Sequence, residues 1–230
     1  MGDDLLALVY TASLWGIPVL LAVTLHEAAH GWTAWKLGDD TAKVLGRVSF
    51  NPLRHIDPVG TVALPGLLLV FSAPFLFGWA KPVPVNFLRL HHPKQAMVIV
   101  AAAGPAINIG LAYLSALLLH LVPMLPPDAA VWVSANLINL IKINVILAVF
   151  NMLPLPPLDG GRVAVGLLPP VLAAPLVRLE RFSFAIIVAI MFFVPLLSRQ
   201  LGQNIDPFFW LVIGPVNYVA RIIAIAAGIQ

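Results

Sequence analysis

The feature that most constrains this chain is a long, mostly apolar run over residues 5–37. As one helix this run would be about 50 Å long, well beyond a hydrocarbon core of about 30 Å. We therefore expect a transmembrane helix that tilts, kinks or protrudes, with the kink at Gly16 and Pro18. Composition agrees, because 60% of the residues are apolar and 10% are charged. With a mean hydropathy of +0.96, the chain is expected to be a polytopic integral membrane protein.

The net charge and the lack of cysteine limit which class of partner and which metal ligands we expect. A net charge of +3 would suggest a nucleic-acid partner in a soluble protein. Here the basic residues lie between apolar runs, and an anionic membrane leaflet accounts for them, so we expect a lipid bilayer as partner and no nucleic acid. The chain has no cysteine, which excludes disulfides and thiolate ligands and leaves His, Asp and Glu for any metal.

The later apolar runs predict an all-α polytopic membrane protein. Together with the first run, residues 95–122, 131–153, 182–197 and 207–227 give about five full transmembrane helices. We find no internal repeat and expect one integral membrane domain over residues 1–230. In the loop after the first helix, apolar and polar side chains alternate enough over residues 46–50 to predict a short strand. Asn51 and Pro52 would end it.

A His-Glu-x-x-His motif lies inside the first run, as His26-Glu27-Ala28-Ala29-His30. Residues four apart share one face of a helix, so His26 and His30 can hold one metal ion while Glu27 acts beside it as a general base. Ionisable groups at membrane depth are costly and are usually functional. If Lys36 marks the interface, His30 lies about 9 Å and His26 about 15 Å inside it. The motif predicts a zinc metallohydrolase with one ion per chain.

A catalytic zinc needs three protein ligands and one open position, so a third ligand must come from elsewhere in the chain. Asp159 is the best candidate, because it follows a helix end and a proline-rich stretch and precedes Gly160 and Gly161. Prolines keep the backbone extended, and glycines allow close approach to other segments. Asp57, in the loop after the first helix, is the competing candidate.

These motifs resemble the site-2 protease family of intramembrane zinc metalloproteases. That family combines a His-Glu-x-x-His helix with a downstream Asn-x-x-Pro…Asp-Gly motif, present here from Asn151 to Gly160. Gly104-Pro105-Ala106-Ile107-Asn108 and Asn51-Pro52 add to the resemblance, which covers roughly residues 20–165. The resemblance implies that Asp159 is the third zinc ligand and that Asn151 helps to hold the substrate or the developing oxyanion. The chain resembles a minimal member, without a PDZ or nucleotide-sensing domain.

The apolar residues 59–80 pose a question of topology, because Pro65, Gly66 and Pro74 interrupt them. If this segment crossed the membrane once, Asp159 would emerge on the opposite face from His30 and could not share its metal. If it dips in and returns, the two motifs meet at one leaflet and the basic loops stay cytoplasmic. We therefore predict a re-entrant or broken segment, buried by protein.

The expected function is hydrolysis of a peptide bond within or near the transmembrane segment of a membrane-protein substrate. The site would lie nearer the cytoplasmic face of a bacterial or archaeal cell membrane. An unwound substrate could pair with the edge at residues 46–50, which makes Arg47, Val48 and Ser49 candidate substrate contacts. Asn108 is expected to give structural support across the bundle.

Two other functions fit a zinc-binding membrane protein, namely a non-proteolytic assembly factor and a transporter. The intact Glu27 argues against the first, because a structural zinc site needs no base. The absence of repeated halves argues against the second. The sequence assigns no role to His55, His91, His92 or His120, and it leaves the oligomeric state open.

Overall fold

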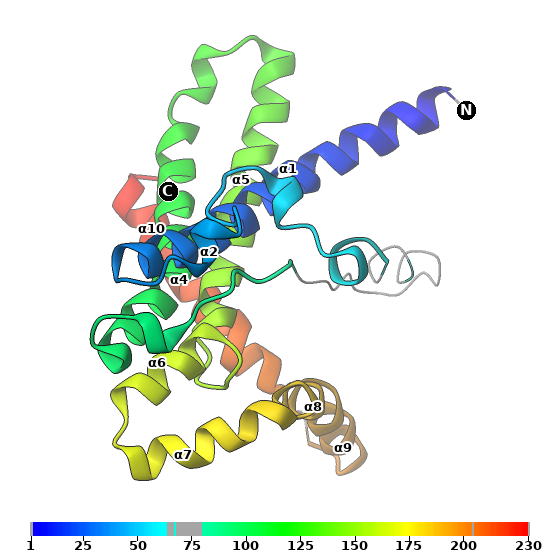
Figure 1. The fold of residues 1–230 in the computed structure, drawn as a ribbon. Coiled ribbons are helices and arrows are strands. Elements are labelled where there is room, and N and C mark those ends of the chain that lie inside the picture. The colour runs from blue at the N-terminus through cyan, green and yellow to red at the C-terminus, as the bar shows by residue number, and fades with distance from the viewer. Residues whose placement is uncertain (1, 64–66, 68–79, 204, 230) are drawn as a thin grey trace.

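The computed structural model describes residues 2–63, 67, 80–203 and 205–229 (Figure 1). Every regular element in these residues is helical, which confirms the predicted all-α class. The described helices of six residues or more are α1 (Gly2–Lys36), α4 (Pro93–Leu119), α5 (Pro127–Asn151), α6 (Asp159–Leu167), α7 (Pro170–Leu179), α8 (Ser183–Val188), α9 (Val194–Gln200) and α10 (Gly214–Ala227), with π-helical η2 (Pro58–Ala63).

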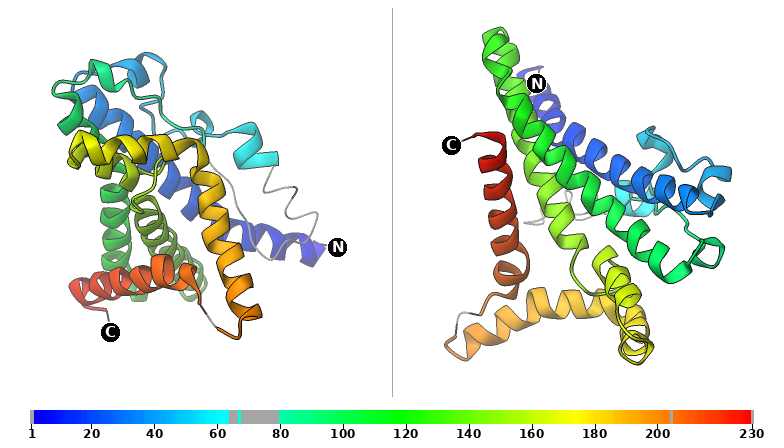
Figure 2. Two further views of the ribbon diagram at one scale, coloured as in Figure 1. Left: turned by 90° about the horizontal axis from the view of Figure 1, so that it is seen from below. Right: turned by 90° about the vertical axis from the view of Figure 1, so that its left-hand side faces the viewer.

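Helices α1, α4 and α5 form the centre of the molecule. Helix α4 packs against both of the others, and α1 also packs against α5 (Figure 2). Helix α10 joins them through a buried cluster in which Ala112 and Ala116 of α4 meet Val145 of α5 and Ile223 of α10. Without a hydrophobic force between helices in lipid, small residues such as these alanines favour association by letting helix backbones approach closely.

Four described helices are long and apolar enough to cross a membrane. They are Val9–Lys36, Pro93–Leu119, Pro127–Asn151 and Phe209–Ala227. The fifth expected span, at residues 182–197, is not among them. Its residues lie in α8, the π-helical η6 (Ala189–Phe193) and α9, which follow one another without a gap. Among the residues that the structure describes, four spans are found, and the predicted count of about five is not supported.

The predicted re-entrant course of residues 59–80 falls largely outside the described residues, so it stays a prediction. At its start, η2 covers Pro58–Ala63. Asp57 precedes this turn, and its Oδ1 accepts hydrogen bonds from the backbone N–H groups of Val59 at 3.0 Å and Gly60 at 2.7 Å. Asp57 is thereby engaged as a cap of the local backbone.

The strand predicted at residues 46–50 is wrong, because these residues form a turn and bends, and the described part of the chain contains no strand. Gly46 has a φ of +65°, outside the extended region. Side chains donate to the backbone carbonyls that would otherwise accept hydrogen bonds from a neighbouring strand. Arg54 donates to the Gly46 carbonyl at 2.6 Å, and His55 donates to the Ser49 carbonyl at 2.9 Å. A sequence in which apolar and polar side chains alternate forms a strand only when a neighbouring strand supplies the partners for its backbone hydrogen bonds.

An extended segment at residues 81–86, here called the strap, runs beside α1. Three backbone N–H groups hold it. Lys81 donates to the His55 carbonyl at 2.8 Å, Val83 to Glu27 Oε2 at 2.8 Å, and Asn86 to Asp39 Oδ2 at 2.6 Å. Prolines alternate with these donors at positions 82 and 84, and proline favours an extended backbone in the residue before it. The strap is thereby fixed along α1 and its loop.

Asp39 is the polar anchor of the strap and is fully buried. Burial raises the pKa of its carboxyl, but hydrogen bonds from Thr41 and from the Asn86 backbone outweigh burial and hold the pKa below its usual range. The charged carboxylate is thus the form that binds the strap.

The turn between α5 and α6 folds tightly back on itself. A Cβ at Gly160 would lie 2.2 Å from the Met152 carbonyl oxygen, and one at Gly161 would lie 2.1 Å from the Pro156 nitrogen. Both contacts are with backbone atoms, which cannot rotate away. The two glycines therefore allow the close approach that brings Asp159 back toward the bundle.

We predict that Gly161→Ala lowers the melting temperature by several degrees, because overpacking against backbone costs about 1–3 kcal/mol. Gly110→Ala in α4 is the matched control, since a Cβ there meets nothing within 4 Å. Both variants should be melted in the same detergent with a fluorescent thiol-independent dye. Equal melting temperatures would contradict the close approach.

Candidate metal centre

His26 and His30 lie one turn apart on the same face of α1, and both are buried. Their Nε2 atoms are 3.0 Å apart, and their rings meet edge to face at a centroid distance of 4.6 Å. This is the arrangement expected of two histidines at positions i and i+4 that serve one ion.

Asp159 joins them as the first residue of α6. Its Oδ2 lies 3.2 Å from His26 Nε2 and 3.3 Å from His30 Nε2. One ligand atom from each of the three residues lies within 4.8 Å of the other two, and all three residues are buried. The competing carboxylate, Asp57, caps a turn and is not in this cluster.

The tautomer of His30 is fixed by a backbone carbonyl. His30 Nδ1 lies 2.7 Å from the carbonyl oxygen of Val100 in α4. A carbonyl oxygen only accepts hydrogen bonds, so Nδ1 must carry the hydrogen. In a neutral imidazole, Nε2 then presents a bare lone pair to the cluster.

The tautomer of His26 is fixed by a chain of two asparagines. His26 Nδ1 lies 2.5 Å from Asn108 Oδ1, and Asn108 Nδ2 donates to Asn144 Oδ1 at 2.6 Å and to the Ala22 carbonyl at 3.3 Å. Asn144 Nδ2 in turn donates to the Leu140 carbonyl at 2.8 Å. Both amides end on backbone carbonyls, so neither can be turned around. His26 Nδ1 is therefore the donor, and its Nε2 also presents a lone pair.

Three acceptor atoms thus converge without a proton between them. Asp159 Oδ2 is buried and has no hydrogen-bond partner among the described residues. Lone pairs that close repel each other, and a buried unpaired carboxylate oxygen is costly. A cation placed among the three removes both penalties. The residues present therefore fit a divalent metal ion, and two imidazoles with one carboxylate suit zinc.

Gly104 makes the space for this cluster. A Cβ at this position would lie 2.4 Å from His30 Nε2 and 2.6 Å from both Cε1 and Nε2 of His26. A side chain at position 104 would occupy the place where the three candidate ligand atoms meet. The glycine of the Gly104-Pro105…Asn108 stretch therefore leaves the site open, and Asn108 orients one of its ligands.

Glu27 is half-buried, between the two histidines in sequence. Its Oε2 accepts a hydrogen bond from the Val83 N–H of the strap at 2.8 Å. The strap side chain Val83 is itself buried, and a Cβ on Gly31 would lie 3.0 Å from its Cγ1. The carboxylate of Glu27 is therefore held by a backbone segment that packs directly on α1.

The other predicted site residues make their contacts outside this cluster. Asn151 ends α5 and is half-buried, and its Nδ2 donates to the Leu147 carbonyl at 3.0 Å. The Arg47 guanidinium donates to the Arg54 carbonyl. Val48 is half-buried, and its Cγ2 would lie 3.1 Å from a Cβ on Gly31.

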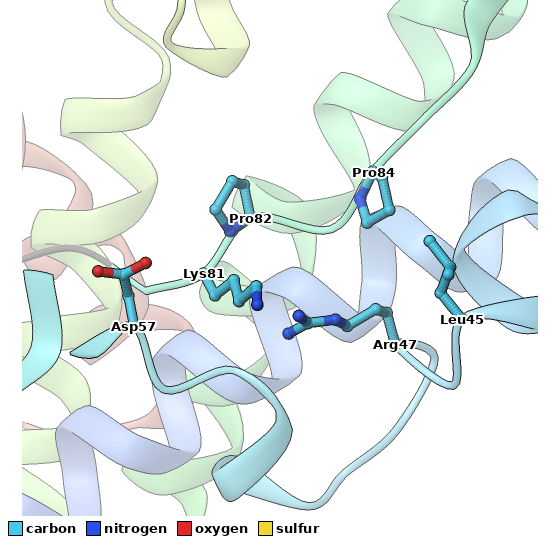
Figure 3. A pocket seen from close by; sticks show the side chains of 6 residues that line it. All are labelled: Leu45, Arg47, Asp57, Lys81, Pro82 and Pro84. Atoms are coloured by element: carbon cyan, nitrogen blue, oxygen red, sulfur yellow. The ribbon is translucent and has the colours of Figure 1, made fainter. Parts of the chain in front are cut away.

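Arg47 also lines a surface pocket of about 490 Å³ beside the strap. Figure 3 shows the side chains of Arg47 and Lys81 pointing toward each other across it. The lining residues are Leu45, Arg47, Asp57, Lys81, Pro82 and Pro84.

The four histidines without an assigned role lie away from the cluster. His55 is tied to the Ser49 carbonyl, and His120 donates to the Ala227 carbonyl at 2.7 Å. The His91 ring lies against Gly38, and His92 precedes α4 with a φ of +52°.

Sequence reasoning missed three groups that position the site, namely Asn144, the Val100 carbonyl and the Val83 N–H. A signal existed for Asn144, because it is a polar residue in the middle of an apolar span, where such residues usually bind a partner. The two backbone groups carry no sequence signal.

We predict that Asn108→Ala weakens zinc binding about 10- to 100-fold, because His26 loses the partner that fixes its tautomer and ring orientation. Asn139→Ala is the matched control, since Asn139 Nδ2 also donates across helices, to the Leu14 carbonyl at 2.8 Å, but does not touch the cluster. Competition with a fluorescent chelator measures both affinities. Equal zinc affinity in the two variants would argue against this role for Asn108.

We also predict that Asp159→Ala loses its zinc while Asp57→Ala keeps about one ion per chain, because Asp159 alone of the two reaches the histidines. Elemental analysis of the purified proteins gives the zinc content directly. Retained zinc in Asp159→Ala together with lost zinc in Asp57→Ala would reverse the assignment.

Comparison with known proteins agrees with this chemistry. The sequence profile of peptidase family M50 matches residues 122–194. The chain is 40% identical over 194 residues to "Putative zinc metalloprotease YwhC" of Bacillus subtilis, covering 83% of this chain and 84% of the relative. It is 30% identical over 193 residues to "Putative zinc metalloprotease Rip2" of Mycolicibacterium smegmatis, covering 83% of this chain and 70% of the relative.

No solved structure shows significant similarity to the chain. The sequence relationships are nevertheless sufficient, since a relative with 40% identity is matched over most of its length. Together with the four apolar helices and the buried cluster, they confirm the resemblance drawn from the two motifs. The chain belongs to peptidase family M50, the site-2 protease family of multi-pass membrane zinc metalloproteases.

Proposed function

We propose that this zinc metalloprotease is an intramembrane endopeptidase, which cleaves a peptide bond within or near a transmembrane segment of other membrane proteins. The observation that carries the proposal is the place of the cluster. His26 and His30 belong to an apolar span, Val9–Lys36, and all three ligand candidates are buried. Ionisable groups at such depth are costly unless function requires them.

His26, His30 and Asp159 would hold the zinc ion. When bound, zinc supplies Lewis acidity, which lowers the pKa of a coordinated water and polarises a substrate carbonyl. Asn108 and the Val100 carbonyl keep the two imidazoles in the tautomer that presents Nε2 to the ion.

Glu27 is the proposed general base. Its carboxylate takes a proton from the attacking water as the oxygen–carbon bond forms, and it delivers that proton to the amide nitrogen as the carbon–nitrogen bond breaks. The Val83 N–H occupies one carboxylate oxygen. This bond restricts rotation of Glu27 and keeps the carboxylate in one orientation beside the histidines.

Asn151 is proposed to donate its amide N–H to the substrate carbonyl as negative charge develops there, without adding a charge of its own. At present its Nδ2 donates to the Leu147 carbonyl one turn back along α5. The amide group carries a second N–H, and we propose that the substrate oxygen accepts a hydrogen bond from it.

A substrate helix must unwind before its backbone can be attacked, because every amide in a helix is already hydrogen-bonded. The pocket beside the strap is a proposed resting place for the unwound segment, with Arg47 as a contact. Val48 and Ser49 are proposed to contribute beside it. The basic residues Lys36 at the end of α1 and Arg47 and Lys81 in the loops favour a cytoplasmic location for this end of the molecule, which would set the site nearer the cytoplasmic face of a cell membrane.

We predict that Glu27→Gln retains zinc but lowers cleavage at least 100-fold, because an amide cannot accept the proton. The chain contains one other glutamate, Glu180, which is exposed beside α7, so Glu180→Gln is the matched control. Zinc content and cleavage should be measured separately. Cleavage can be followed by comparing membrane proteomes of cells that express wild type, Glu27→Gln or Glu180→Gln.

The expected result is a set of membrane proteins that accumulate only with Glu27→Gln and that are shortened near a transmembrane segment in the other two strains. Unchanged cleavage with Glu27→Gln would exclude Glu27 as the base. Zinc-loaded wild type whose membrane proteome equals that of Glu27→Gln would favour a non-proteolytic zinc protein instead.

A further inference from the structure

Lys142 is a charged residue in the middle of α5 that the proposed chemistry does not use. It lies 15 residues after the start of the helix at Pro127 and nine residues before its end at Asn151. These intervals correspond to about 22 Å and about 14 Å along the helix axis. Lys142 is exposed on the helix surface, and α5 is one of the four helices fit to cross a membrane.

The depth of Lys142 matches that of the metal centre. Lys142 is two residues from Asn144, whose side chain binds Asn108, which in turn binds His26. Two residues correspond to an axial rise of about 3 Å. The ammonium group therefore starts from the level of the site, far from either end of the helix, where snorkelling to the interface is hardest.

The other charged residues of the four spans have a local explanation. Lys36, Lys94 and Asp128 lie within two residues of a helix end, and Arg221 lies six residues before the end of α10. Glu27 is bound by Val83. Within the part of the chain that the structure describes, Lys142 alone among them is deep, exposed and without a hydrogen bond or ion pair.

The surface around Lys142 suits another helix. Ile138 and Ile146 lie one turn before and one turn after it, and both are exposed, at 41% and 39%. The three residues, here called the Lys142 face, form an apolar stripe with one positive charge at its centre. In hydrocarbon such a charge is stabilised by an opposite charge at the same depth.

A second copy of this chain does not supply that charge. The carboxylates near this depth are Glu27, whose Oε2 is bonded to Val83, and Asp159, which is buried in the cluster. The complementary group must come from a different protein.

We propose that the Lys142 face docks a transmembrane helix of another membrane protein, which places a carboxylate against the Lys142 ammonium. The two charges pair at the depth of the metal centre, while Ile138 and Ile146 pack against apolar residues one turn away on the partner. Docking involves no cleavage step, so it can be tested independently of the proteolytic function.

The test uses the zinc-loaded Glu27→Gln variant of the whole 230-residue chain in phosphatidylcholine nanodiscs. The probe is a synthetic Leu/Ala transmembrane helix with one glutamate at its centre, and the same helix with glutamine is its control. Binding is measured by energy transfer between labels on the two chains. We expect the glutamate helix to bind at least tenfold more tightly than the glutamine helix.

Variants assign this preference to Lys142. Lys142→Leu should abolish the preference, Lys142→Arg should keep it, and Lys142→Glu should transfer it to a helix with a central lysine. Arg221→Leu, at the exposed residue of α10, is the matched control and should behave as wild type. Each variant is first checked for zinc content and a single peak in size-exclusion chromatography. The complementary Lys142→Glu pair keeps the test decisive if Lys142→Leu folds poorly.

Three results would overturn the proposal. One is equal binding of the glutamate and glutamine helices to the unmodified Lys142 face. A second is an unchanged preference in Lys142→Leu. The third is binding of an anionic lipid that depends on Lys142 and that excludes the glutamate helix from the Lys142 face, which would identify a lipid headgroup as the partner.

Discussion

The structure depends on one unfavourable contact, the meeting of three lone-pair acceptors at the buried centre of a helical bundle. The Nε2 atoms of His26 and His30 lie 3.0 Å apart, and Asp159 Oδ2 lies within 3.3 Å of both. Hydrogen bonds on the far side of each ring prevent either imidazole from turning a proton inward. A divalent cation among the three atoms would make this arrangement favourable, because it would bind all three lone pairs.

Three glycines around the cluster allow its three ligand atoms to come together. Gly104 removes the side chain that would fill the space between the ligand atoms, and Gly160 and Gly161 let the α5–α6 turn fold back far enough to bring Asp159 in. Zinc would thus join α1 to a segment more than a hundred residues later in the chain. The two asparagines that support His26 are buried, and the hydrogen bonds that orient both histidines end on backbone carbonyls.

Glu27 of α1 and Lys142 of α5 are both charged residues of membrane spans, but only Glu27 has a partner within the described chain. Glu27 receives a backbone N–H from the strap, which ties the proposed base to the loops on one side of the bundle. Lys142 is exposed at a similar depth and receives no partner within the described chain. The Glu27 carboxylate is oriented by a group of its own chain for its proposed role as the base. The exposed Lys142 is explained most simply by a charge that another protein supplies, because a membrane offers no other strong counter-charge at that depth.

Composition predicted the membrane class, and two histidines four residues apart on one helix predicted the zinc chemistry. The proline- and glycine-rich stretch around Asp159, together with the resemblance to the site-2 protease family, indicated the motif that meets them. Helix rotation and relative depth emerge only when the helices pack, so the Val100 carbonyl and the Val83 N–H could not be predicted as partners of the site. Asn144 could be recognised as a polar residue inside an apolar span, but its partner Asn108 could not be named. The strand expected at residues 46–50 failed for the same reason, since alternation is local whereas a strand needs a partner. Local periodicity is a property of the chain, but hydrogen bonds between segments depend on the register that packing selects.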